Sequence, residues 1–159
     1  MAVALVETTI APLRVETDAA DRVVVAVDFD TASQTAAAPH SLATEAAIRL
    51  QGWLQQPVAA VSLVDIPTRQ VGTAFQAAVW EQLRAIRCGE RVSYATIAQR
   101  CGRPRAARAV GAACGRNRLC LLVPCHRVVA ADGSLGGFRW GLAIKERLLA
   151  AEQKTTARV

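Results

Sequence analysis

An apolar stretch interrupted by three polar residues constrains this chain more than any other feature. Residues 121–129 read Leu-Leu-Val-Pro-Cys-His-Arg-Val-Val. The apolar flanks can be buried and fix the backbone, and Pro124 biases the preceding residue towards an extended conformation. The chain is therefore expected to turn at Cys125 and to hold Cys125, His126 and Arg127 within reach of solvent or a ligand. A thiol beside a base and a cation is typical of a nucleophile with a lowered pKa. The alternative is an inert, buried thiol that packs like a small apolar side chain.

The remaining cysteines favour reduced thiols over a metal site or a disulfide framework. All five cysteines lie in the second half of the chain, no Cys-x-x-Cys pair occurs, and the only histidines are His40 and His126. This pattern argues against a structural zinc site and fits an intracellular chain. The sequence has neither an apolar run of the ~20 residues that a membrane span needs nor a secretory signal pattern. We therefore expect a cytoplasmic protein without a membrane segment.

Charge is divided unevenly along the chain. Residues 1–70 hold four basic and eight acidic residues, whereas residues 71–159 hold fifteen basic and five acidic residues. This asymmetry indicates that only the second half binds a polyanion such as nucleic acid. The alternative is an arginine-rich composition without a binding role, because a charge patch alone is a weak signal.

The first half predicts a small α/β domain that ends near Ile66. The β-branched run at 22–29 is typical of a strand, with residues 11–15 as a partner strand. Ser41 is placed to cap an alanine-rich helix that Pro57 ends, and residues 58–64 predict another short strand. Residues 67–72 then form a linker.

The second half predicts helices. Thr73 and Gln76 form a capping-box pattern for a helix that Gly89 stops, and Ser93 caps a second helix ending at Cys101. Pro104 suits the first position of a third helix over 105–114, and a last helix covers 141–152, with a frayed polar end at 153–159. Two short helices around a glycine-containing turn are typical of a helix-turn-helix. The spacing puts Arg105 and Arg108 on one helical face. The small side chains of that helix suit close approach to a duplex and an internal packed helix equally well.

The order of these motifs resembles one family. Pro-Cys-His-Arg-Val at 124–128, followed by Gly-Ser-Leu-Gly-Gly-Phe-Arg-Trp-Gly at 133–141, is similar to the active-site region of the O6-alkylguanine-DNA alkyltransferases. The match runs from about Thr73 to Glu152. It implies an α+β fold with a small ribonuclease-H-like α/β domain at 1–66, a linker at 67–72 and a mostly helical alkyltransferase domain at 73–159 with a winged helix-turn-helix.

The resemblance also implies a role for individual residues. Cys125 is the nucleophile, His126 its base through a water, and Glu152 orients the histidine; Tyr94 donates to the leaving guanine and Asn117 holds the turn beside the cysteine. Arg108 fills the space of a flipped guanine. The other residues implied in DNA binding are Ser93, Arg105, Ala106 and Ala107. The residues implied in the base pocket are Val128, Gly136, Gly137, Phe138 and Arg139, where Phe138 replaces a common tyrosine.

The implied activity is direct-reversal repair of DNA. One alkyl group would pass from O6-alkylguanine in duplex DNA to Cys125, with O4-alkylthymine as a further candidate substrate. The base must leave the stack first. We expect one turnover, no metal, no cofactor and a monomer. Three alternatives stay open: a non-catalytic module that recognises alkylated DNA, a helix-turn-helix transcription regulator and a cysteine hydrolase, which the basic helical half disfavours.

Overall fold

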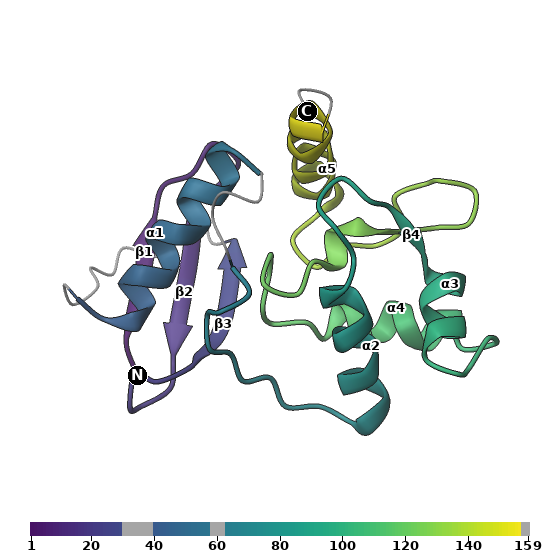
Figure 1. Ribbon diagram of the computed structural model, residues 1–159, viewed down its shortest axis with the longest axis horizontal. Helices are drawn as coiled ribbons and strands as arrows, with labels where there is room; N and C mark the ends of the chain where they lie inside the picture. Colours follow the sequence, from purple (N-terminus) through teal and green to yellow (C-terminus); the bar gives the residue numbers. More distant parts are fainter. Residues whose placement is uncertain (30–39, 58–62, 157–159) are drawn as a thin grey trace. The chain divides into compact units, whose positions relative to one another are not determined.

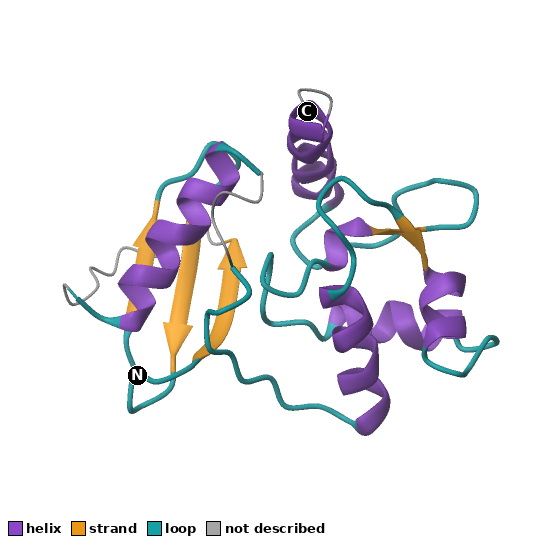
Figure 2. Cartoon of the chain, in the orientation of Figure 1, coloured by secondary structure: helices purple, strands orange, loops and turns teal. Residues whose placement is uncertain are grey.

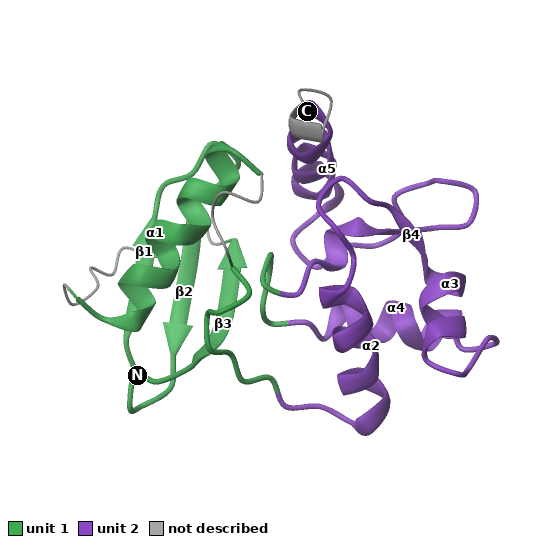
Figure 3. Cartoon of the chain, in the orientation of Figure 1, with its two compact units in different colours: residues 1–70, 118–122 green, residues 71–117, 123–159 purple. Residues whose placement is uncertain are grey.

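The chain forms two compact units. The structure, a computed structural model, describes residues 1–29, 40–57 and 63–156. One unit comprises residues 1–70 and 118–122, and the other comprises residues 71–117 and 123–159 (Figure 3). The division expected from the sequence was contiguous, so the assignment of 118–122 to the first unit departs from it. Hydrogen bonds to a strand of the first unit account for this difference.

The first unit is a three-stranded antiparallel sheet with one helix against it (Figure 1). The strands are β1 (Val3–Val6), β2 (Leu13–Thr17) and β3 (Val24–Phe29), in the order β1-β2-β3. Helix α1 (Leu42–Gln55) packs mainly on β1 and β2. The inward side chains of β2 alternate with outward ones, which is the pattern of a sheet with one covered face.

The helix cap predicted in this unit is confirmed. The Ser41 side chain accepts a hydrogen bond from the backbone N–H of Thr44, and α1 ends shortly before Pro57. Most of the strand expected over 58–64 lies outside the described residues, and Leu63 and Val64 are not in a strand.

The free edge of β3 binds the segment 118–122. The backbone N–H of Val27 donates to the Arg118 carbonyl (2.7 Å), and the N–H of Cys120 donates to the Val27 carbonyl (3.1 Å). An unpaired strand edge exposes donors and acceptors, and these bonds satisfy part of that edge. Sequence patterns do not report such long-range pairing, which is why the segment was assigned to the second domain.

The second unit is mostly helical (Figure 2). Helix α2 (Ala74–Arg84) begins with the predicted capping box of Thr73 and Gln76. It ends at Arg84, so the expectation that it continues to Gly89 is wrong. The chain leaves the helix one turn earlier, and Gly89 instead takes a positive φ of 80° in the following loop.

Two further helices, α3 (Tyr94–Arg100) and α4 (Ala107–Gly115), pack on each other and on α2. The predicted Ser93 cap of α3 is confirmed by its bond from the N–H of Thr96 (3.0 Å). The expected start of α4 at Pro104 is wrong. Pro104 and Arg105 lie in the preceding turn, so Arg105 and Arg108 do not share a helical face.

The remaining elements surround the cysteine. A single 3-10 turn, η1 (Cys125–Arg127), leads into β5 (Val128–Val129), which pairs in parallel with β4 (Val92–Ser93). The last helix, α5 (Leu142–Thr156), packs on η1 and runs past its expected end at Glu152. Of the end expected to be frayed, residues 153–156 are helical, and residues 157–159 lie outside the described residues. Within the described ranges, no helix is both long and apolar enough to cross a membrane.

Candidate active site

Cys125 opens onto a pocket of about 610 Å³ within the second unit. The side chain is held in η1, is only 3% exposed and faces the pocket with its thiol. The Asn117 amide donates to Cys125 Sγ (3.2 Å) and to the Val123 carbonyl (2.8 Å). The amide therefore fixes both the sulfur and the backbone that carries it, as expected from the sequence.

The pocket brings together residues that are far apart in the sequence. Helix α4 supplies Arg108 and several small residues, α3 supplies Tyr94, and the loop before α5 supplies the rest of the predicted wall. The predicted site residues that line it are Cys125, Arg108, Ala107, Tyr94, Gly137, Phe138 and Arg139. The predicted residues that are not among its lining residues are Val128, Gly136, Ser93, Arg105, Ala106, Asn117, His126 and Glu152.

Gly136 packs against Tyr94, a residue of the pocket wall. Its φ of +63° is in the left-handed region, and a Cβ there would lie 2.9 Å from the Tyr94 ring. Only glycine allows this backbone to approach the ring so closely. The Tyr94 hydroxyl donates to the next carbonyl, that of Gly137 (3.4 Å). Gly136 therefore positions Tyr94 and the loop, in place of the lining role expected from the sequence.

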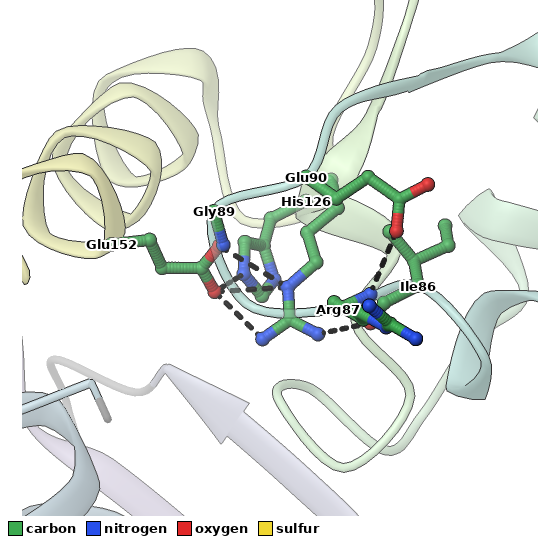
Figure 4. Close-up of polar contacts among 7 residues, drawn as sticks. Ile86, Arg87, Gly89, Glu90, His126 and Glu152 are labelled. Carbon is green, nitrogen blue, oxygen red and sulfur yellow. Dashed lines mark hydrogen bonds and ion pairs between the residues drawn. The ribbon is translucent and has the colours of Figure 1, made fainter. Parts of the chain in front are cut away.

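A buried network joins His126 to Glu152 (Figure 4). His126 Nε2 lies 2.8 Å from Glu152 Oε1, and both side chains are fully buried. The Arg127 guanidinium binds the same carboxylate, with Nη2 2.8 Å and Nε 3.0 Å from Oε1. The expected pairing of His126 with Glu152 is thus present, and Arg127 is a third member that the sequence reasoning missed.

The loop after α2 completes this network. The Gly89 N–H donates to Glu152 Oε2 (2.9 Å), and Arg127 Nη1 donates to the Ile86 carbonyl (2.6 Å) (Figure 4). The loop, η1 and α5 therefore meet at one carboxylate. A buried carboxylate needs several donors to stay ionised, and Glu152 has them.

These contacts set the charge states. Burial acts to raise the pKa of Glu152, but the hydrogen bonds and charges of His126 and Arg127 outweigh it and lower that pKa to about 2. Burial lowers the pKa of His126, against the opposing effect of Glu152. Glu152 is therefore a carboxylate whose charge Arg127 balances, and His126 rests as a neutral imidazole able to accept a proton.

The resting thiol differs from the expectation. The adjacent base and cation predicted a lowered pKa for Cys125, yet burial raises the pKa of this thiol to about 11, although Asn117 and Lys145 oppose the rise. Arg127 does not help, since its charge is engaged by Glu152. Cys125 therefore rests as a thiol, and a reaction through this sulfur requires its proton to leave during the reaction.

Lys145 of α5 is a second residue that the sequence reasoning missed. Its ammonium donates to the carbonyls of Val128, Leu135 and Gly137. The carbonyl of Val128, a residue that the resemblance placed in the base pocket, therefore already accepts from Lys145. Within the described ranges, no group of three or more His, Cys, Asp or Glu side chains could hold a metal ion.

The structure is a two-unit α+β chain in which a cysteine of η1 lines the same pocket as an arginine of helix α4. The profile of the family described as "6-O-methylguanine DNA methyltransferase, DNA binding domain" matches residues 74–154. The chain belongs to this family. Its structure is similar to that of the O6-methylguanine methyltransferase of Mycobacterium tuberculosis (TM-score 0.81, 31% identity, 98% of this chain and 94% of that chain). It is also similar to the same organism's OGT in complex with DNA (TM-score 0.79, 33% identity, 95% and 92% of the chains).

Curated relatives match a part of the chain. The bifunctional transcriptional activator/DNA repair enzyme Ada of Escherichia coli is 44% identical over 95 residues, which are 60% of this chain and 27% of that protein. The methylated-DNA–protein-cysteine methyltransferase of Kluyveromyces lactis is 45% identical over 83 residues, 52% of this chain and 44% of that protein. The matches thus span about a quarter to a half of these relatives.

Proposed function

We propose that this chain repairs alkylated DNA by moving the alkyl group of O6-alkylguanine onto Cys125, once per molecule. The observation that carries the proposal is the shared pocket of Cys125 and Arg108. The transfer requires a thiol that a base can reach. It also requires a cation that faces the DNA beside the same opening, because the lesion arrives as part of a duplex.

The lesion reaches the pocket only after it leaves the base stack, which costs a few kcal/mol. Arg108 is exposed on α4 and offsets this cost by occupying the space of the displaced guanine. Ala107 and Gly111 are small, so the surface of α4 can approach DNA closely. Helices α3 and α4 then act as a helix-turn-helix against a groove of the duplex. Arg105, in the turn before α4, is placed for phosphate contact together with Ser93 and Ala106 at the helix starts.

The chemical step is a displacement at saturated carbon. The Cys125 sulfur forms a bond to the alkyl carbon, the carbon–O6 bond breaks, and the thiol proton passes through a water to His126, which Glu152 orients. Tyr94 donates to N3 of the guanine as that base takes up negative charge. The stable thioether on Cys125 ends the reaction, so each chain acts once.

Further features of the proposal follow the family. The first unit, residues 1–70 with the segment 118–122, corresponds to a ribonuclease-H-like domain, and the second to a winged helix-turn-helix alkyltransferase domain. The chain acts as a monomer in the cytoplasm, needs no metal or cofactor, and has O4-alkylthymine as a further candidate substrate.

A regulatory function is the second candidate. The relatives in Escherichia coli and Salmonella typhimurium are named as a transcriptional activator and a regulatory protein, but this chain spans only 27% and 29% of them. A regulator or a non-catalytic recognition module needs the helices and Arg108, but has no use for Cys125 in the pocket. A hydrolase would need an acyl substrate, which an arginine beside the opening does not favour.

Titration of a duplex with a single O6-methylguanine tests the proposal. We expect the lesion to revert to guanine with a stoichiometry of one lesion per chain, followed by no further repair. Cys125→Ser should bind the duplex and leave the lesion intact. If the wild-type chain bound the duplex without repairing it, alkyl transfer would be excluded, and a recognition module or a regulator would remain as the function.

Arg108→Ala separates base flipping from chemistry. We expect transfer from the duplex to slow by about tenfold or more, because a few kcal/mol of flipping cost is no longer offset. Transfer from the free base O6-benzylguanine should stay nearly unchanged, since no base has to be displaced. Equal slowing of both reactions would contradict the flipping role. Arg22→Ala, in the first unit, provides the control for losing one arginine.

A further inference from the structure

Lys145 carries a charged group in a fully buried position. Its side chain is 0% exposed, and it projects from α5 towards the loop that precedes this helix. The ammonium donates to the carbonyl of Val128 (2.6 Å), to that of Leu135, and to that of Gly137 (3.2 Å). An ammonium has three N–H donors, and here each has a neutral backbone acceptor.

The positive charge of this ammonium is not balanced by an acid. Among the residues that the structure describes, no carboxylate lies within ion-pair distance of Lys145, in contrast to Arg127 on Glu152. Burying a cation without a counter-ion is costly. Carbonyl dipoles reduce this cost but leave the net charge in place. Such an arrangement is expected where an anion forms during function.

The groups around the ammonium belong to the pocket. The rings of Tyr94 and Phe138 have their centroids 5.9 Å and 6.0 Å from Nζ. The Gly137 carbonyl accepts from both Lys145 and the Tyr94 hydroxyl. Lys145 therefore joins the strand that follows Cys125 to the loop that lines the opening, and its charge lies next to the residues that would hold a purine.

We propose that Lys145 is a positioning residue whose uncompensated charge favours the anionic form of Cys125 while its three hydrogen bonds hold the pocket loop in place. The proposal deepens the proposed alkyl transfer and rests on it. Lys145 touches neither sulfur nor DNA in this account. It acts through the field at the sulfur and through the carbonyls of Val128, Leu135 and Gly137.

Several other polar or titratable groups belong to the same pocket or to the buried network and have to be kept constant. Asn117 donates to the sulfur, and Cys114 and Tyr94 share its pocket with raised pKa values of about 12, so both stay neutral. The remaining charged or titratable groups are His126, Glu152 and Arg127 from the buried network and Arg108 and Arg139 at the pocket. Substitutions at Lys145 leave all of these side chains chemically unchanged.

The test is the rate at which iodoacetamide alkylates Cys125 at neutral pH, followed by peptide mass spectrometry, with no DNA present. Lys145→Gln and Lys145→Met remove the charge, and the flexible methionine chain suits a buried gap if the amide is not tolerated. Lys145→Arg keeps the charge. Lys154→Gln removes the charge of an exposed lysine on the same helix and is the matched control.

Loss of a nearby cation should raise the pKa of the thiol by at least about one unit. Each such unit lowers the rate at a fixed pH by about threefold, because a more basic thiolate is also a better nucleophile. We therefore expect Lys145→Gln and Lys145→Met to react at least about threefold more slowly than wild type at neutral pH, where Lys145 carries its charge. Lys145→Arg and Lys154→Gln should keep the wild-type rate.

An unchanged rate in both neutral variants would overturn the proposal, as would an equal slowing in Lys145→Arg, which would assign the effect to geometry alone. The reagent reaction does not involve DNA, so failure of the proposed function is distinguishable. If the wild type left O6-methylguanine duplex unrepaired while the alkylation rate still depended on Lys145, alkyl transfer would fail and the role of Lys145 in ionising the thiol would stand.

Discussion

The two buried charged residues of α5, Glu152 and Lys145, have opposite kinds of partner. Glu152, at one end of the helix, accepts from His126, Arg127 and the Gly89 backbone. Lys145, two turns earlier, has only carbonyl oxygens as partners. The first charge is balanced and holds three segments together, whereas the second is unbalanced and lies beside the pocket.

This difference separates structural from chemical roles on one helix. A balanced charge contributes to folding, and its removal leaves its partner buried and unpaired. An unbalanced charge contributes little to folding and is available to an anion that forms later. We therefore expect substitutions of Glu152 to affect stability strongly and substitutions of Lys145 to affect mainly reactivity.

The largest effect is expected from Glu152→Gln. The substitution leaves the Arg127 guanidinium buried without a counter-ion, so the free energy of unfolding should fall by about 3–5 kcal/mol. Urea denaturation measures this loss, and Glu146→Gln, at an exposed position of the same helix, should change stability by less than about 0.5 kcal/mol. If Glu152→Gln lowered the unfolding free energy only slightly, the expected difference in stabilising effect between Glu152 and Lys145 would be contradicted.

Acid should weaken the fold through the same carboxylate. The folded pKa of Glu152, about 2, is below the ordinary value of 4.5. Its contribution to stability is therefore complete above pH 4.5 and is lost as the pH falls towards about 2. Thermal melts across this window should show a steeper acid decline for wild type than for Glu152→Gln. Parallel curves would indicate that the carboxylate is not paired in solution.

A smaller effect on stability is expected from Lys145→Met. The variant loses hydrogen bonds to three carbonyls but no longer buries an unbalanced cation, and these effects oppose each other. The change in unfolding free energy should be at most about half that of Glu152→Gln, while the alkylation rate of Cys125 falls. A loss of stability equal to that of Glu152→Gln would show that Lys145 is primarily structural.

The smallest effect is expected in alkali. Burial lowers the pKa of Lys145 below its ordinary 10.5, so the charged form costs stability in the folded chain. That cost disappears as the pH rises through the folded pKa towards 10.5, because the unfolded chain then binds more protons. Wild type should gain stability relative to Lys145→Met in this range. Urea denaturation of the two chains across this pH range measures the difference.

Local signals in the sequence predicted the helix starts well. Ser41, Thr73 and Ser93 cap their helices as expected, since an N-cap depends on residues within one turn. The start of α4 was predicted wrongly because Pro104 is equally suited to the turn that precedes a helix.

The candidate site was predictable where a motif named its residues. Cys125, Asn117, Arg108 and Tyr94 come together as expected. The roles of Arg127 and Lys145 were not predictable, because both depend on carbonyls and a carboxylate from distant loops and helices. The raised pKa of Cys125 was missed for the same reason, since burial is a tertiary property.

Alkyl transfer to Cys125 is tested most directly by finding which sulfur carries the transferred group. The chain is incubated with a duplex that contains one O6-methylguanine, and the masses of its cysteine peptides are measured, with unmodified duplex as the control. We expect one added methyl group on the peptide with Cys125 and none on the peptide with Cys114, which lines the same pocket. A methyl group on Cys114, or unmodified peptides beside a repaired lesion, would contradict this expectation.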